Sequence, residues 1–347
     1  CSSDLQRLNR GAPSRASNLR ERARCLGAIR SFFDDDGYIE VSTPALVRHP
    51  GLEPHLIPIP CGVSGADGSA AGPPRYLITS PEYHMKRLLA GGLERIYYLG
   101  PCWRAEEQGP HHLEEFCMLE WYQAHATLQQ LMEQTEALLE HLALQIRGTT
   151  STSYQGRPLE LGRPFERVSF AEALELHAGM QVRGVVQREE LLERALAAGF
   201  GPFDPDEGFD AIVSRVLVER VEPALAGSRR PVFLYDFPAP LAALARLRPE
   251  DPGVAERFEL YAGGVELANA FGELTDAAEQ RRRLEHDRAR RAALGRDAFD
   301  LDEQFLAALE QGMPPAAGIA LGVDRLVALL LDAPSVQDVV AFHGDEI

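Results

Sequence analysis

The chain has 347 residues, a length that suits one large domain or two small ones. Its apolar fraction of 45% is enough for a sizeable core, and its net charge of −17 argues against a broad surface for nucleic-acid phosphates. There is no apolar run long enough to span a bilayer and no signal-peptide pattern, so we expect a cytoplasmic protein. The scattered cysteines include no CxxC pair, which argues against a disulfide framework and a zinc site.

The first part of the chain predicts alternating helices and strands. Residues 1–16 are polar and predict a loose arm, followed by a single domain over residues 17–347. A helix is predicted from Ser17 to a glycine cap at Gly37, and residues 61–74 predict a loop rich in small residues. Strands are predicted at 38–41, 76–79, 96–99 and 116–121, and helices from Pro81 to about 89 and over 128–146.

The second part predicts hairpins with helices between them. Residues 149–250 predict a hairpin, two or three helices and a strand at 232–235. Strands at 258–261 and 265–271 are joined through Gly263-Gly264, which indicates a hairpin. A helix at 276–294, a strand at 316–321 and a helix at 323–331 follow. These connections favour an α+β fold, with a mainly antiparallel sheet flanked by helices.

The sequence contains no P-loop and no GxGxxG turn, so a bound nucleotide would have to contact side chains projecting from strands. Arg104 and Glu106 are two residues apart and are expected to share one face of a strand. Arginine suits the α-phosphate, glutamate can accept from an adenine amino group, and Phe116 can stack on the base. Glu120 and Tyr122 share a face in the same way. A surface hairpin with paired charges explains the same pattern.

Glu259, Glu266 and Glu273 follow one another at intervals of seven residues. Glu266 lies in an apolar strand, where an unpaired carboxylate is costly, and Mg²⁺ carrying triphosphate oxygens would relieve that cost. The alternative is a salt-bridged strand that faces Arg257 or the arginines at 281–283.

A third group runs from Gly318 to Arg325. Small residues end a strand, and Arg325 opens a helix whose N-terminus could bind phosphate. A glycine-led helix start with an exposed arginine is the alternative. Lys86 is the only lysine in the chain, which suggests that the position matters, although chance explains it more simply.

Together the three groups resemble the motifs of the class II aminoacyl-tRNA synthetases. Trp103-Arg104-Ala105-Glu106 resembles motif 2 and Gly322-Val323-Asp324-Arg325 resembles motif 3. Motif 1, the dimer interface of that family, resembles the segment containing Phe33, Gly37, Glu40, Val41, Thr43 and Pro44.

Further stretches resemble the lysyl branch of that class, and within it the β-lysine ligases of elongation factor P. The matching stretches are Ser80–Leu88, Glu120–Tyr122 and Glu266–Asn269, and the resemblance runs from about residue 18 to 342. Only residues 1–16 precede the first predicted helix, where lysyl-tRNA synthetases carry an anticodon-binding barrel. The family pattern has Asn-Pro where this chain has Leu113-Glu114, and it has Gly at Ala270.

The resemblance implies roles for the matching positions. The catalytic residues would be Arg104, Arg325 and Glu266, and Mg²⁺ would be held by Glu259 and Glu266. ATP would contact Arg104, Glu106, His112, Phe116, Glu266, Leu267, Gly322 and Arg325. The amino acid would contact Ser80, Glu82, Glu120, Tyr122, Asn269, Phe271, Glu273 and Ala320, the last replacing a glycine of the lysyl-tRNA synthetases.

The implied reaction has two steps. The carboxylate of lysine or β-lysine attacks the α-phosphate of ATP, and a lysine amine of elongation factor P then attacks the resulting adenylate. A homodimer is expected, and neither a membrane nor tRNA is expected as a partner. Three alternatives stay open: a minimal lysyl-tRNA synthetase, a non-catalytic paralogue acting as a regulator, and an asparagine-synthetase-like amide ligase.

Overall fold

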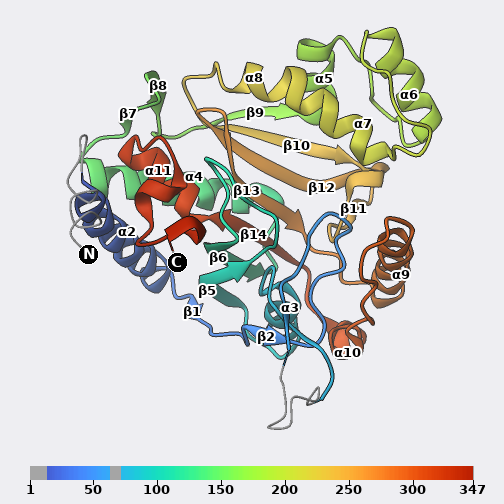
Figure 1. Ribbon diagram of the computed structural model, residues 1–347, viewed down its shortest axis with the longest axis horizontal. Helices are drawn as coiled ribbons and strands as arrows, with labels where there is room; N and C mark the ends of the chain where they lie inside the picture. The colour runs from blue at the N-terminus through green and yellow to red at the C-terminus, as the bar shows by residue number, and fades with distance from the viewer. Residues whose placement is uncertain (1–13, 63–71, 347) are drawn as a thin grey trace. The chain divides into compact units, whose positions relative to one another are not determined.

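The computed structural model describes residues 14–62 and 72–346 (Figure 1). The described residues fall into two compact units. The first takes them from Cys1–His125, Thr275–Pro315 and Ala320–Ile347, and the second from Ala126–Leu274 and Ala316–Ile319. Most of the predicted arm and of the predicted loop, residues 1–13 and 63–71, lie outside the described residues.

The first unit is organised around two long antiparallel strands. β5 (Arg95–Trp103) pairs with β6 (Glu115–Ala124), and β1 (Ile39–Glu40) runs parallel to β5. Helix α2 (Arg15–Asp35) precedes them and begins two residues earlier than predicted, because Ser14 Oγ accepts from the Ser17 N–H. Phe33 of α2 stacks on Tyr97 of β5 at 4.8 Å, which fastens the helix to the strands.

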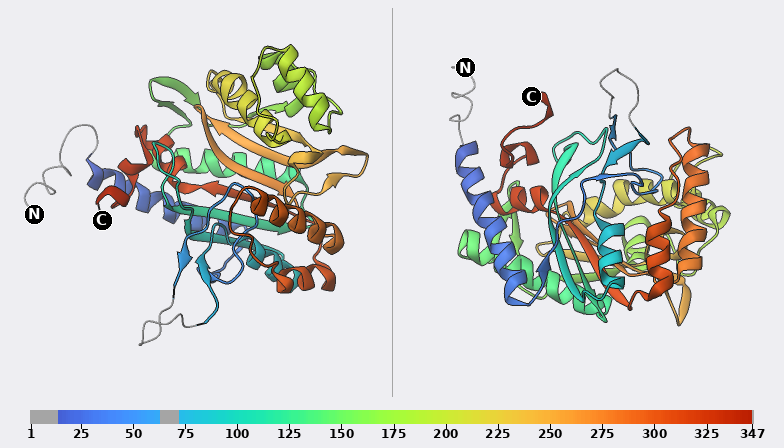
Figure 2. Two further views of the ribbon diagram at one scale, coloured as in Figure 1. Left: turned by 45° about the vertical axis from the view of Figure 1, so that its right-hand side comes forward. Right: turned by 90° about the horizontal axis from the view of Figure 1, so that it is seen from below.

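Three helices of the first unit pack together: α3 (Glu82–Ala90), α9 (Ala277–Ala293) and α10 (Glu303–Gly312) (Figure 2). Tyr83 of α3 stacks on Phe305 of α10 at 4.5 Å. Helix α10 was not predicted from the sequence, although Asp302 caps it by accepting from the Gln304 and Phe305 N–H groups. The remaining elements are β2 (Leu46–Val47), β3 (Pro60–Cys61), β4 (Arg75–Leu77), α11 (Val323–Leu331), η3 (Val336–Val339) and η4 (Gly344–Glu346).

The second unit contains strands in the order β13, β12, β10 and β9, with β11 (Leu247–Arg248) beside β12. β13 (Val265–Gly272), β12 (Asp251–Ala262) and β10 (Val232–Pro238) are antiparallel, whereas β9 (Glu166–Ser169) runs parallel to β10. The β12–β13 hairpin turns at Gly263 and Gly264, as predicted, with φ of +59° and +86°. β14 (Ala316–Gly322) is divided between the two units at Ile319.

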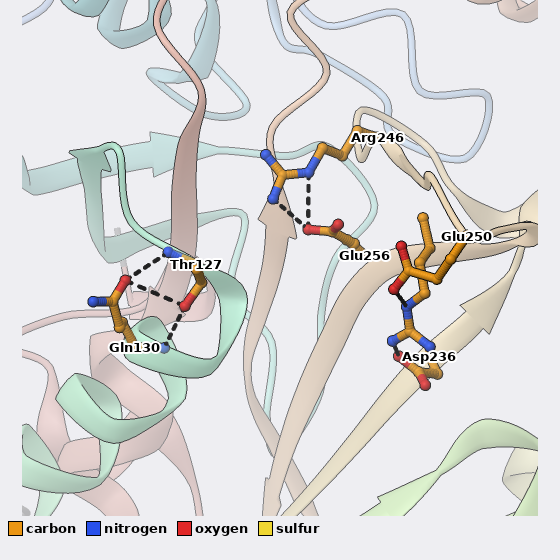
Figure 3. Close-up of polar contacts among 7 residues, drawn as sticks. Thr127, Gln130, Asp236, Arg246, Glu250 and Glu256 are labelled. Atoms are coloured by element: carbon orange, nitrogen blue, oxygen red, sulfur yellow. Dashed lines mark hydrogen bonds and ion pairs between the residues drawn. The ribbon is translucent and has the colours of Figure 1, made fainter.

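Helices cover the strands of the second unit (Figure 1). α4 (Leu128–Arg147) packs on β13, and its capping box joins Thr127 and Gln130 (Figure 3). Phe170, Ile212 and Phe237 belong to a core formed between the other helices and β10. The other elements are β7 (Ser151–Tyr154), β8 (Arg157–Glu160), α5 (Phe170–Ala178), α6 (Arg188–Ala197), α7 (Phe209–Val216), η1 (Leu217–Val221), α8 (Glu222–Leu225) and η2 (Ala239–Leu241).

Ion pairs tie the β10–β12 region together on its polar side. Arg246 donates to Glu256 at 2.6 Å, and Asp236 and Glu250 both pair with Arg248 (Figure 3). The predicted fold class is confirmed, because the strand pairs within the units are mostly antiparallel and helices lie between groups of strands. None of the described helices combines the length and the apolar character needed to cross a membrane.

Candidate functional site

A buried polar chain connects the start of α3 with β6. Ser80 Oγ donates to Glu120 Oε2 at 2.8 Å, and the Tyr122 hydroxyl donates to Glu120 Oε1 at 2.7 Å. Ser80 Oγ also accepts from the Glu82 N–H at the first turn of α3. Glu120 is 1% exposed, so both of its oxygens are satisfied inside the protein. The structure thus brings together Ser80, Glu82, Glu120 and Tyr122, and the predicted shared face of Glu120 and Tyr122 is confirmed.

Glu82 is held by the only lysine of the chain. Lys86 Nζ donates to Glu82 Oε1 at 2.6 Å, one helical turn apart on α3. The lysine side chain has no exposed surface. Burial of an ammonium group is costly unless a carboxylate compensates it, so this pair holds the Glu82 carboxylate in a single orientation. No role for Lys86 was predicted from the sequence.

A small pocket opens beside Ser80 and Glu82. It is also lined by Glu53, a residue that was not among the predicted site residues. Burial, and secondarily the charge of Glu82, raise the pKa of the Glu53 carboxyl to about 7. The signal that could have found Glu53 is that it is the only acidic residue in positions 41–66. The remaining lining residues are Val47, His49, Gly51, Ile78, Thr79, Tyr83 and His84.

Arg104 lies just beyond β5, not on it. The prediction that Arg104 and Glu106 share one face of a strand is wrong, because β5 ends at Trp103 and Glu106 has a φ of +65° in the following turn. The Ala105 N–H donates to the Ile57 carbonyl, which takes the chain out of the sheet. The Arg104 guanidinium lies over the Phe116 ring, 5.0 Å from its centroid. It also faces Glu107 at 3.7 Å.

The segment Leu113-Glu114, which departs from the family pattern, has a structural role. Leu113 is buried. The Glu114 carbonyl accepts from the Arg104 N–H at 2.9 Å, and Glu114 Oε1 accepts from the Glu106 N–H at 3.1 Å. The Glu114 carboxylate therefore stabilises the turn that carries Arg104 and Glu106.

Arg325 forms a second basic corner of the first unit. It lies in the first turn of α11, whose N-cap is Gly322, and its Nε donates to the His111 carbonyl at 2.9 Å. Burial, followed by the charge of Arg325, lowers the pKa of both His111 and His112. The two imidazoles are therefore neutral at pH 7, and the positive charge of this corner comes from the guanidinium. Ala320 is half-buried on β14.

In the second unit, Arg257 is the centre of the predicted residues. It donates to Glu259 Oε1 at 2.6 Å and to Asn269 Oδ1 at 3.2 Å, and it lies over Phe271 at 5.8 Å. Asn269 and Phe271 project from β13, and Glu259 projects from β12. From the sequence, Arg257 was expected only as a possible salt-bridge partner, and the salt bridge to Glu259 is present.

Glu259 and Glu266 both lie near Tyr261. The Tyr261 hydroxyl donates to Glu259 Oε2 at 2.7 Å, and Tyr261 pairs with Glu266 in the β12–β13 register. Burial and the two nearby carboxylates raise the pKa of Tyr261 far above its usual value. Leu267 and Glu273 are buried, and the Glu273 N–H donates to the Ala316 carbonyl. Within residues 14–62 and 72–346, no three His, Cys, Asp or Glu side chains are grouped to hold a metal ion.

Comparisons with known proteins cover almost the whole chain. A family model described as "tRNA synthetases class II (D, K and N)" matches residues 6–346. The protein named elongation factor P--(R)-beta-lysine ligase of Edwardsiella ictaluri is 43% identical over 343 residues, which cover 99% of both chains. Proteins of the same name from Erwinia tasmaniensis and Photorhabdus laumondii are each 43% identical. Each match covers 95% of this chain, and it covers 95% of the Erwinia protein and 96% of the Photorhabdus protein.

Proposed function

Because this chain belongs to the class II tRNA synthetases of the D, K and N type, we propose that it activates lysine or β-lysine with ATP and transfers it to a lysine side chain of elongation factor P. The observation that carries the proposal is the buried chain Ser80–Glu120–Tyr122 beside Glu82. Buried carboxylates backed by a phenol select an ammonium group by charge pairing. The relatives named for this reaction match over almost their full length, which supports the same substrate class.

In the first step, the carboxylate of the amino acid attacks the α-phosphate of ATP, and pyrophosphate leaves. Arg104 and Arg325 are the guanidinium groups that would stabilise charge on the phosphates, since both are permanently charged and carry forked donors. Phe116 would lie against the adenine, and Glu106, His112, Leu267 and Gly322 would line the rest of the ATP site. In the second step, an amine of elongation factor P attacks the acyl carbon, and AMP leaves. No side-chain nucleophile is needed.

Glu259 and Glu266 would hold Mg²⁺. The fit is supported by their approach to one Tyr261 from neighbouring strands, since Mg²⁺ in nucleotide sites takes one or two carboxylates and completes its shell with phosphate oxygens and water. Glu259 already accepts from Arg257 and Tyr261, so it would share its oxygens. The metal would supply charge neutralisation at the triphosphate. Asn269, Phe271, Glu273 and Ala320 would complete the amino-acid pocket.

The proposal extends to the setting of the enzyme. A cytoplasmic location fits translation-related chemistry, and the four described cysteines are free. A homodimer through the motif 1 segment is supported by Ile39 there, which is 51% exposed.

Two assays test the function. Pyrophosphate exchange should proceed with lysine or (R)-β-lysine, and a Glu266→Gln variant should lose it while keeping its fold. Transfer to purified elongation factor P should then exceed transfer to tRNA. If no amino acid supports pyrophosphate exchange, the enzyme assignment is rejected. If tRNA is acylated and elongation factor P stays unmodified, elongation factor P is rejected as the acceptor.

A third assay addresses the choice of lysine isomer. Ala320 adds a methyl group where the lysyl-tRNA synthetases have glycine, and this methyl reshapes the pocket. Ala320→Gly should shift the ratio of kcat/KM from β-lysine toward α-lysine. An unchanged ratio would remove Ala320 from the specificity determinants.

A further inference from the structure

Glu53 belongs to a short segment that arginines anchor through its backbone. Arg291 Nη1 donates to the Glu53 carbonyl at 2.8 Å and to the Leu56 carbonyl at 2.7 Å. Arg296 Nη1 donates to the Pro54 carbonyl at 2.5 Å. Arg291 is 1% exposed, so this guanidinium is held inside the protein to position main-chain oxygens. The segment is therefore a rigid support for the side chain of Glu53.

The carboxyl group that this segment presents has an unsatisfied oxygen. Glu53 Oε2 is buried and has no hydrogen-bond donor within the described part of the chain. Folded proteins pair such atoms, or keep them for a ligand. Gly51 makes room for the carboxyl group, because a Cβ at that position would overlap Glu53 Oε2. The backbone, the glycine and the free acceptor all point to a built position rather than to a stray surface glutamate.

This carboxyl group lines the same pocket as Ser80 and Glu82. The charge of Glu82 is compensated by Lys86 at 2.6 Å, whereas no basic side chain pairs with Glu53 within the described residues. A cation that enters the pocket is therefore attracted more strongly by the Glu53 carboxylate than by that of Glu82, which Lys86 already neutralises. The pKa of Glu53 is raised to about 7 by burial and by Glu82, as expected for a carboxyl group that no positive side chain in the described part of the protein neutralises.

We propose that Glu53 is an additional substrate-binding residue, which accepts a hydrogen bond from one ammonium group of the diamino acid. This inference rests on the proposed function and extends it. When the substrate enters near neutral pH, the proton on the Glu53 carboxyl leaves to solvent, and the ammonium group takes its place as the donor to Oε2. The competing explanation is that Glu53 stays protonated and only fills space beside Gly51.

The main test compares Glu53→Gln with the exposed Glu94→Gln as a matched control. Because Glu53→Gln removes a hydrogen bond between charged groups, we expect KM for lysine in pyrophosphate exchange to rise about 10- to 100-fold, with kcat changed less than about twofold. Glu94→Gln should behave as the wild type. Gly51→Ala should reproduce the rise in KM, because its methyl group displaces the carboxylate while Gly51, whose φ is not positive, accepts alanine without backbone strain.

Calorimetry supplies a readout that does not depend on turnover. Titration of lysine into the enzyme at pH 7, in buffers of different ionisation enthalpy, should show a fraction of a proton released in the wild type and less in Glu53→Gln. Norleucine and 6-aminohexanoate each lack one ammonium group. The analogue whose affinity is insensitive to Glu53→Gln lacks the group that Glu53 binds.

The outcomes separate the two proposals. If the wild type binds and activates lysine and Glu53→Gln has the same KM, the role of Glu53 is overturned and the proposed function stands. Wild-type protein that binds and activates no amino acid would overturn both. A rise in KM that is accompanied by a loss of thermal stability in Glu53→Gln, with proton release unchanged from the wild type, would establish the space-filling explanation instead.

Discussion

Lys86 Nζ lies 2.6 Å from Glu82 Oε1, and the two residues are one turn apart on α3. Glu82 is 12% exposed and Lys86 is not exposed at all, so the pair is shielded from water. A chain that otherwise uses only arginine for its permanent positive charges thus keeps its single lysine at this place. The compact ammonium group, with three donors on a flexible stem, fits inside a helix packing surface where the planar guanidinium fits less easily.

Removing one partner of this pair should be costly. Lys86→Met keeps the apolar stem and deletes the charge, which leaves Glu82 uncompensated. We expect the free energy of unfolding to fall by about 3–5 kcal/mol in urea denaturation. Arg24→Met is the matched control, because Arg24 pairs with Glu21 at 2.7 Å but is 56% exposed, and it should lose less than about 1 kcal/mol. Equal losses in the two variants would contradict the buried-pair argument.

The burial of Lys86 also predicts amine reactivity. In the folded protein, an acylating reagent should modify the N-terminal amine and leave Lys86 untouched, since its side chain has no exposed surface. Unfolding in guanidinium before labelling should add one acyl group, at Lys86. Peptide mass spectrometry measures both states, and rapid labelling of Lys86 in the native protein would show that the pair opens readily.

Glu53 predicts a pH dependence of stability. Its folded pKa of about 7 is above the unfolded value near 4.5, so the native state retains a proton that the unfolded chain releases between these pH values. The contribution of Glu53 to stability is complete below about pH 4.5 and falls as pH rises to 7, by at most about 3 kcal/mol. The charged and titratable groups that face it are Glu82, Tyr83, Arg104, Asp287, Arg291, His49 and His84.

The measurement compares the wild type with Glu53→Gln. Urea unfolding at pH 5, 6 and 8 should show Glu53→Gln gaining stability relative to the wild type as pH rises. Glu94→Gln should track the wild type throughout. A difference between wild type and Glu53→Gln that does not change with pH would mean that Glu53 titrates normally.

Arg104 predicts a loss of activity without a loss of fold. Arg104→Lys keeps the charge but removes the planar fork over Phe116 and the Nε donor, which is buried and bonds to no acceptor in residues 14–62 and 72–346. We expect kcat/KM in pyrophosphate exchange to fall about 10- to 100-fold, with the unfolding free energy within about 1 kcal/mol of the wild type. Arg24→Lys serves as the control on the surface. Full activity in Arg104→Lys would exclude a forked contact with the phosphate.

Much of the local structure could be predicted because the signals lie close together in the sequence. Apolar residues at helical spacing predicted α4, glycines at the turn predicted the β12–β13 hairpin, and alternation along β6 placed Glu120 and Tyr122 on one face. The extent of β5 was not predicted correctly around Arg104. That strand ends where the Ala105 N–H turns to the Ile57 carbonyl, and a partner 48 positions away leaves no periodic mark at Arg104.

The sequence by itself determined the fold class, the family and the set of charged residues that a nucleotide and a diamino acid require. These follow from patterns within short windows and from the order of motifs along the chain. Only the tertiary structure decided which charges are compensated and which are not. Glu82 meets Lys86 within one helical turn, but Glu53 reaches their pocket because Arg291, 238 residues further along the chain, binds its carbonyl. Burial and long-range hydrogen bonds set the charge state of a carboxyl group, and neither is encoded in the spacing of its neighbours.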